Sequence, residues 1–228
     1  MNLNFGDDPY LAIIGDIKDS KKLKNRKSIQ EKLKNTLKTI NEKYPKNIAS
    51  KFTITLGDEF QGLLFNGVKV IPIITEIEQE MYPIEIRFGI GIGKISTFID
   101  REIAIGADGP GYYKAREALE HLKQSEQKKQ TAKADIRIEA VGGPHKALEL
   151  INTIFSLMTA IKDSWSDRQR ETIWNMQKYQ DSQTKAATRL GITQPSVQKN
   201  LAKGNYYTYQ DAQKVVQEFL AGIGRKDV

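Results

Sequence analysis

The chain has 228 residues, 39% of them hydrophobic and 28% charged, which is typical of a soluble globular protein that can bury its own core. It contains no cysteine, which excludes disulfides and thiolate metal sites and favours a cytoplasmic location. The net charge of +7 favours a polyanionic partner. No apolar run approaches the ~20 residues of a membrane-spanning helix, so we expect no membrane partner.

Hydrophobic periodicity predicts alternating strands and helices in the first part of the chain. The apolar run at 10–15 predicts a buried strand, and apolar residues at helical spacing predict a helix over 21–43. Two strand-like runs at 52–56 and 60–65 flank a Gly-Asp turn, which is a hairpin pattern. Further along we expect a helix over 67–81, a strand over 84–93, a helix over 112–122, a lysine-rich mobile loop over 123–133 and a strand over 136–141.

The strand at 84–93 carries glycine at every second position near its end. Its alternation places Gly89, Gly91 and Gly93 on one face of the strand. A face without side chains allows a ligand or another backbone to approach closely, and the pattern leaves both alternatives open.

After Pro144 the sequence predicts only helices, over 145–162, 167–179, 182–190, 194–203 and 209–221. The βαββαβ order before it predicts an α+β fold with a ferredoxin-like, palm-type domain, followed by an all-α domain. We therefore expect one domain over 1–143, a connecting helix over 144–164 and a helical domain over 165–228.

Two acidic residues follow the predicted central strands. In a βαββαβ sheet the first strand and the hairpin are neighbours, so we expect Asp16 and Asp58 to face each other. Close carboxylates repel each other, and a divalent cation such as Mg²⁺ (or Mn²⁺) removes that cost. A helix N-terminus expected at residues 18–20 offers N–H groups to a phosphate. The hypothesis is a metal site at Asp16 and Asp58 with a nucleotide held by Ile17, Lys18, Asp19, Ser20, Lys21 and Gly57.

Each of these features also has a purely structural interpretation. A Gly-Asp turn is common at hairpin tips, and the run from Asp16 to Ser20 is typical of a helix N-cap. The combination with the strand order and the glycine strand favours a ligand site.

The hairpin sequence Leu56-Gly57-Asp58-Glu59-Phe60 resembles the GGDEF signature of diguanylate cyclases and the Gly-Asp turn of class III nucleotidyl cyclases. The resemblance implies two metal ions held at Asp16 and Asp58, with Glu59 as a further ligand. It also places Lys114 and Arg116 near the positions of transition-state groups, as nucleotide-binding residues.

Several positions depart from those enzymes. Leu56 replaces the first glycine of the GGDEF signature, and Ile54 stands where class III cyclases carry a base-selecting lysine. Tyr113 and Glu117 stand where an Asn and an Arg would stabilise the transition state. The resemblance therefore supports binding of a metal and nucleotide better than cyclisation.

The chain as a whole is similar to the SatD family of bacterial proteins. The similarity rests on four stretches, which are Gly15-Asp16-Ile17-Lys18-Asp19-Ser20, the segment from Thr55 to Gly62, the triple-glycine strand and Asp108-Gly109-Pro110. It implies the fold and says little about a reaction.

Residues 182–204 have the pattern of a helix-turn-helix. Small residues at Ala186 and Ala187 suit a close helix contact, and Gly191 suits a turn with positive φ. Apolar residues at Ile192, Val197 and Leu201 follow, and the segment before this unit resembles the lead-in to region 4 of sigma factors. The second helix would present DNA-binding side chains from Gln194, Ser196, Gln198, Lys199 and Lys203. A helical hairpin for packing or dimerisation is the alternative.

These observations support three functional hypotheses. The leading one is a DNA-binding regulator, with double-stranded DNA and a nucleotide as partners and a homodimer as its form on DNA. The second is an active nucleotidyl cyclase with a regulatory helical tail, and the third is a structural protein. The only histidines, His121 and His145, lie in helix-like stretches, which argues against a catalytic triad or a histidine-ligated zinc site.

Overall fold

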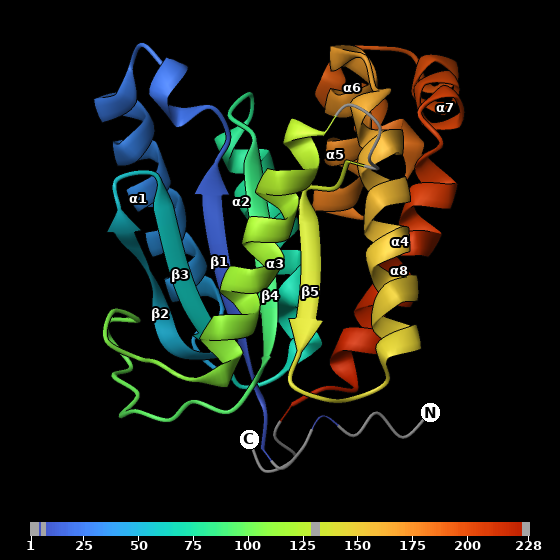
Figure 1. Ribbon diagram of the computed structural model, residues 1–228. Coiled ribbons are helices and arrows are strands. Elements are labelled where there is room, and N and C mark those ends of the chain that lie inside the picture. Colours follow the sequence, from blue (N-terminus) through green and yellow to red (C-terminus); the bar gives the residue numbers. More distant parts are fainter. Residues whose placement is uncertain (1–4, 6–7, 129–132, 225–228) are drawn as a thin grey trace. The chain divides into compact units, whose positions relative to one another are not determined.

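The computed structural model describes residues 5, 8–128 and 133–224 (Figure 1). These residues form two compact units. The described residues up to 156 and from 216 onward form the first, and residues 157–215 form the second. Two helices, α4 (His145–Asp163) and α8 (Tyr206–Ala221), each run from one unit into the other.

The first unit is built on one five-stranded sheet with the order β2-β3-β1-β4-β5. Its strands are β1 (Tyr10–Ile17), β2 (Ile48–Leu56), β3 (Glu59–Leu64), β4 (Ile86–Gly93) and β5 (Ile136–Ala140). β1 is antiparallel to both β3 and β4, while β5 is parallel to β4. The first four strands and their two helices thus form the predicted ferredoxin-like βαββαβ arrangement, extended by a further helix and β5.

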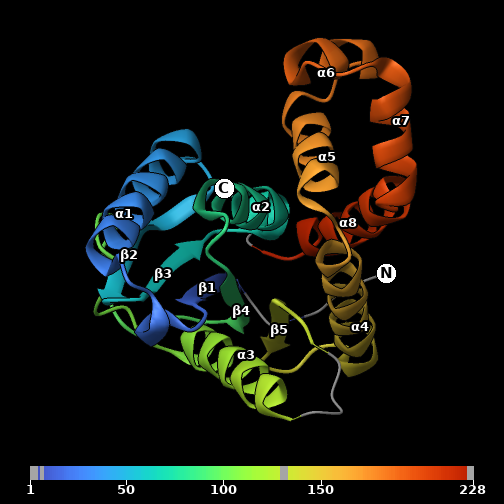
Figure 2. The same cartoon turned by 90° about the horizontal axis from the view of Figure 1, so that it is seen from above.

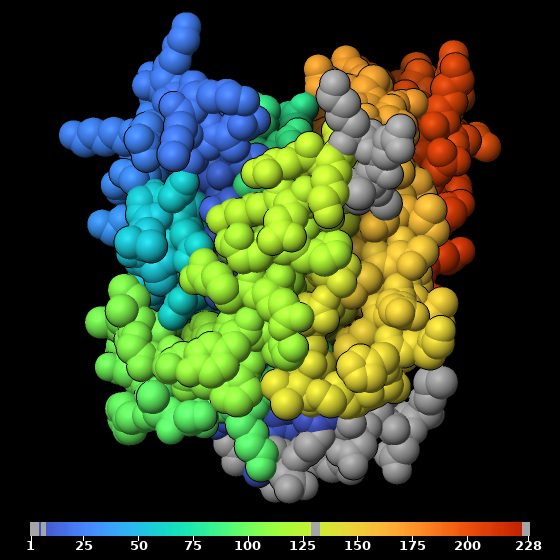
Figure 3. Space-filling model, viewed as in Figure 1, coloured from blue at the N-terminus to red at the C-terminus, as the bar shows by residue number. Residues whose placement is uncertain are grey.

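Helices cover both faces of this sheet. Figure 2 shows α1 (Arg26–Lys43) and α2 (Val70–Met81) on one face and α3 (Pro110–Gln127) on the other. Short 3₁₀ turns, η1 (Ser20–Lys22) and η2 (Gly67–Lys69), precede α1 and α2. In Figure 3 the yellow-green surface of α3 lies over the strands.

The glycine stripe of β4 accommodates the backbone of α3. A Cβ at Gly91 would overlap the carbonyl oxygen of Gly111, and a Cβ at Gly89 would overlap that of Ala115. The second of the two alternatives left open by the sequence is therefore the observed one. Side chains from Ala12, Ile14, Leu63, Tyr112 and Leu119 complete the core around this contact.

Two predicted boundaries are wrong. Residues 123–127 continue α3 instead of forming a mobile loop, because Lys123 and Glu126 form ion pairs with sheet residues; residues 129–132 of that predicted loop lie outside the described residues. α1 begins at Arg26, not at Lys21, because Asp19 has a left-handed backbone (φ 50°) and η1 intervenes.

Both edges of the sheet are bound by an asparagine from a helix. Asn41 of α1 accepts a hydrogen bond from the Phe52 N–H on β2 at 2.8 Å and donates one to the Phe52 carbonyl at 3.0 Å. Asn152 of α4 makes the same two bonds with Ile138 on β5, both at 2.9 Å.

The second unit contains α5 (Asp167–Tyr179), α6 (Gln183–Leu190) and α7 (Gln194–Lys203). Trp165 lies at their centre, where its indole N–H donates to the Gly204 carbonyl at 2.7 Å and its ring meets that of Tyr209 edge-on. Arg170 packs over the rings of both Trp165 and Trp174.

The division of the chain differs from the expected one at its C-terminal end. The last turns of α8 belong to the first unit, where Gln217 donates to the Val68 carbonyl at 2.7 Å and Gly67 N–H donates to Ile223. Of the part of the chain that the structure describes, no helix is long and apolar enough to span a bilayer.

Candidate functional site

Asp16 and Glu59 lie side by side on the sheet. The register of β1 pairs Asp16 with Glu59 on β3 and with Arg87 on β4. Residues directly opposite each other share a face of the sheet, and here it is the face covered by α3. Both carboxylates are buried, with exposed fractions of 7% for Asp16 and 6% for Glu59.

Protein cations neutralise both carboxylates. Asp16 Oδ2 accepts from Arg87 Nη1 at 2.7 Å, and its Oδ1 lies 3.1 Å from Lys123 Nζ. Glu59 binds Arg116 of α3 through both oxygens, with 2.8 Å from Nη2 to Oε1. Every carboxylate oxygen of this pair therefore has a cationic partner.

The ion pairs extend toward β5. Arg87 also donates from Nε to Glu126 at 2.9 Å, and Lys18 Nζ lies 2.6 Å from Asp135. Burial alone would lower the pKa of Lys18, but the hydrogen bond and charge of Asp135, with Glu126 and Glu85, raise it. Lys18 is therefore firmly cationic and held within the network of ion pairs.

Asp58 lies at the hairpin tip and contacts the segment that follows β1. Its carboxylate accepts a hydrogen bond from the Ser20 hydroxyl, and its carbonyl accepts from Ile17 N–H at 3.0 Å. Gly57 has a left-handed backbone (φ 47°), and its carbonyl accepts a hydrogen bond from the Gln30 side-chain amide at 2.8 Å. These bonds hold the hairpin tip beside the end of β1. The carboxylate opposite Asp16 is that of Glu59, however, and not that of Asp58, which the sequence predicted to face Asp16.

In the second unit, a short turn over residues 191–193 joins α6 to α7. Gly191 ends α6 with φ 61°, and the N–H of Ile192 donates to the Ala187 carbonyl at 3.1 Å. Thr193 caps α7 by accepting from the N–H of Ser196. The side chains of Ala186, Val197 and Leu201 are fully buried between the helices.

The five predicted DNA-binding side chains divide into two groups. Gln198, Lys199 and Lys203 are exposed on α7. Gln194 and Ser196 are half-buried and make local bonds, because Gln194 donates to Gln183 at 2.7 Å and the Ser196 hydroxyl lies 2.9 Å from that of Thr193.

The sequence matches the model of one known protein family. The SatD family model matches residues 10–220. The chain belongs to the SatD family. No curated protein matches the sequence.

Two solved structures resemble this SatD chain. The crystal structure of the guanylyl cyclase Cya2 has a TM-score of 0.38 and 11% identity, covering 50% of this chain and 70% of that one. A regulator of polyketide synthase expression from Bifidobacterium adolescentis has a TM-score of 0.28 and 11% identity, covering 94% of this chain and 86% of that one.

The described part of this SatD chain shows no preformed cluster of metal ligands. Among the described residues, no group of three or more His, Asp or Glu side chains is placed to hold a metal ion. A divalent cation at Asp16 and Glu59 would have to displace the guanidinium and ammonium groups that already compensate their charge. The arrangement fits an ion-pair network, and no metal-dependent step follows from it.

Of the predicted nucleotide-binding residues, Ile17 and Ser20 lie against the hairpin tip at Asp58, whereas others are bound elsewhere. The expected helix N-terminus at residues 18–20 is instead the three-residue η1, where Asp19 pairs with Lys22 at 2.9 Å and Lys21 is exposed. Lys114 pairs with Glu117 at 2.6 Å on α3. The guanidinium group of Arg116 is bound to the Glu59 carboxylate, so its N–H groups on that side are already used within the protein.

Sequence reasoning missed Arg87, Lys123 and Glu126 as members of this network. Two signals were present. Arg87 continues the glycine face of β4 by two residues, and Arg116 and Lys123 are seven residues apart, which places them on one side of α3.

Proposed function

We propose that this SatD-family protein is a DNA-binding regulator that inserts α7 into the major groove of double-stranded DNA. The proposal rests on the distribution of side chains around α7, which has one buried apolar side and one exposed polar side. Val197 and Leu201 are fully buried on one side, whereas Gln198, Lys199 and Lys203 are exposed on the other.

The exposed side chains suit both parts of DNA recognition. A glutamine amide can form a pair of hydrogen bonds with an adenine edge, and lysines can bind phosphates or guanine. Residues 163–228 hold ten Lys/Arg and seven Asp/Glu, a net of +3, so attraction to the backbone is moderate. Specificity must then depend on a few contacts from α7, and a homodimer on a two-fold symmetric site would double them.

The test is selection of bound sequences from a random double-stranded library, followed by mobility-shift titration. Replacing Gln198 and Lys199 by alanine should weaken binding to the selected site at least about tenfold, the effect of losing one good base contact. The matched control replaces Lys34 and Asn35 on the exposed side of α1, which removes the same charge and one amide. Equal binding by both double variants would reject the proposal.

A nucleotide ligand of the first unit is a second candidate, and with it nucleotidyl cyclase activity. It is supported by Asp16 and Glu59 standing together on adjacent central strands, beside the Asp58 hairpin. It requires Arg116 or Lys123 to release a carboxylate. Product analysis after incubation with each nucleoside triphosphate and Mg²⁺ or Mn²⁺ tests the enzyme. A thermal-shift series with the same compounds on the wild type and on Asp58→Asn tests binding alone.

A further inference from the structure

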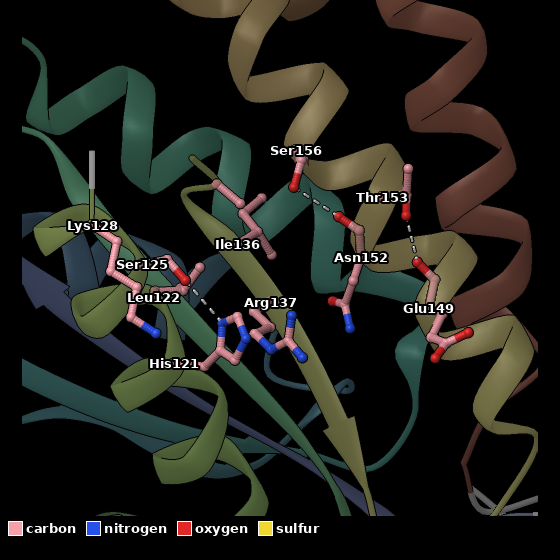
Figure 4. A pocket seen from close by; sticks show the side chains of 11 residues that line it. His121, Leu122, Ser125, Lys128, Ile136, Arg137, Glu149, Asn152, Thr153 and Ser156 are labelled. Atoms are coloured by element: carbon pink, nitrogen blue, oxygen red, sulfur yellow. Dashed lines mark hydrogen bonds between the residues drawn. The ribbon is translucent and has the colours of Figure 1, made fainter. Parts of the chain in front are cut away.

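A cavity lies along the outer strand of the sheet, between α3, β5 and α4 (Figure 4). Its volume is about 550 Å³, within the range of small-molecule sites in proteins. All of its lining residues belong to the first unit. None of them is a member of the Asp16–Glu59 ion-pair network.

The walls of the cavity are held in place by hydrogen bonds. Asn152 of α4 binds both backbone groups of Ile138, which fixes α4 against β5. Arg137 is oriented by Glu139, with 2.9 Å from Nε and 2.7 Å from Nη2 to the same carboxylate oxygen. Leu122 and Ile136 supply a buried apolar floor. A ligand would meet an arrangement that is largely formed in advance.

Nitrogen donors gather at one end of the cavity. His121 of α3, Lys128 directly after that helix and Arg137 of β5 line it together, and Figure 4 shows the His121 ring beside the Arg137 side chain. The Ser125 hydroxyl lies 3.3 Å from His121 Nδ1. When that hydroxyl donates to Nδ1, the neutral ring carries its proton on Nε2 and offers it as a donor.

At this end the cationic groups of Arg137 and Lys128 line the cavity near His121, with Glu139 beside Arg137. Partial burial, then Arg137 and Lys128, hold the pKa of His121 below its ordinary value, and the opposing effect of Glu139 does not restore it. Glu149 of α4 lines the other end of the cavity as an acceptor. The cavity therefore has a cationic end, an apolar floor and an acceptor, an order that suits an amphiphilic anion.

We propose that this cavity binds a small phosphorylated organic molecule, with its phosphate among His121, Lys128 and Arg137 and its apolar part over Leu122 and Ile136. The inference does not depend on DNA binding by α7 or on a ligand at Asp16. Nucleotides carry the required chemistry, as do other organic phosphates, and inorganic phosphate shares only the charged part.

The protein is suited to a direct test because it has two histidines. In NMR titrations of the full chain at constant ionic strength, AMP should move the imidazole signals of His121 in a saturable way. A bound phosphate favours the protonated ring, so the pKa of His121 should rise. His145, at the start of α4 and outside the cavity lining, is the internal reference. Inorganic phosphate and adenosine serve as the two partial probes.

Arg137→Gln should weaken the AMP response at least about tenfold, the effect of losing one charge-assisted hydrogen bond. Lys128→Gln, at the exposed end of α3, provides a second variant that does not disturb the sheet. Lys38→Gln on α1 removes the same charge at an exposed position and should leave the response unchanged. The proposal is overturned if AMP leaves His121 unmoved, if His145 responds equally, if inorganic phosphate alone binds, or if both cavity variants match the control.

Discussion

Arg116 of α3 and Glu59 of β3, 57 residues apart in sequence, form a two-point ion pair across the interface between helix and sheet. Lys123, seven residues further along α3, forms a second ion pair with Asp16. The two ion pairs together hold α3 on the sheet. The carboxylates that resemble cyclase metal ligands thus serve in this structure to dock a helix.

The ion pair between Arg116 and Glu59 should contribute to the stability of the fold. Arg116→Ala should lower the free energy of unfolding by about 1–3 kcal/mol, because Glu59 is left buried without its charged partner. The value stays below that of a fully buried pair, since the Arg116 side chain is 44% exposed. Urea unfolding followed by circular dichroism measures it. The double variant Glu59→Gln with Arg116→Met should recover part of the loss, and no recovery would contradict the assignment.

The response to Mg²⁺ follows from the same contacts. Mg²⁺ alone should leave the melting temperature of the wild type nearly unchanged, because the oxygens of Asp16 and Glu59 already bind protein cations. Arg116→Ala frees Glu59, so this variant should gain stability as Mg²⁺ is raised at constant ionic strength. Strong stabilisation of the wild type would instead show that the ion pairs open for a metal.

Packing of α3 on β4 should tolerate no side chain at Gly91. Gly91→Ala should destabilise the protein by about 3 kcal/mol or more, since the new methyl would overlap the backbone of Gly111 and Ala115. Gly106→Ala is the control. It places a methyl in open space at φ 94° and so adds backbone strain alone, about 1 kcal/mol. Thermal unfolding of both variants compares the two costs.

Acidification should weaken the fold through His121. Its pKa is lowered in the folded protein, so the unfolded chain binds the proton more readily. Stability from this group is complete above its unfolded pKa of about 6.5 and is lost as the pH falls toward the folded value. The difference in stability between pH 7 and pH 5 should be smaller in His121→Gln. If the stability difference between pH 7 and pH 5 is the same in the variant and the wild type, other groups are responsible for the loss of stability at low pH.

The roles of Lys203 and Gln198 on α7 should be separable by salt titration. If Lys203 binds a phosphate, Lys203→Ala should reduce the slope of log K against log salt by about one and weaken all sequences alike. Gln198→Ala should mainly relax the preference for one base pair, by about 1–3 kcal/mol. Binding isotherms on a selected site and on a single-base variant distinguish these outcomes.

The sequence predicted features that depend on local pattern. The hairpin at Asp58, the strand order around β1 and the turn at Gly191 all follow from short-range signals of periodicity, glycine and capping. The glycine stripe predicted a close approach and left the approaching group open.

Features that depend on docking and register could not be predicted. Whether Asp16 meets a metal or Arg87 depends on the pairing of β1 with β4 and on the position of α3, which no local pattern specifies. Glu126 resembles a solvent-exposed residue of a loop until its partner Arg87 is known, because an ion pair between distant segments leaves no periodic signal.

The two asparagines at the sheet edges have a consequence for association between copies of the chain. Each amide imitates one residue of a neighbouring strand, at Phe52 on β2 and at Ile138 on β5. A strand from another molecule would have to expel the amide and its helix before it could pair there, which guards against fibril-like growth.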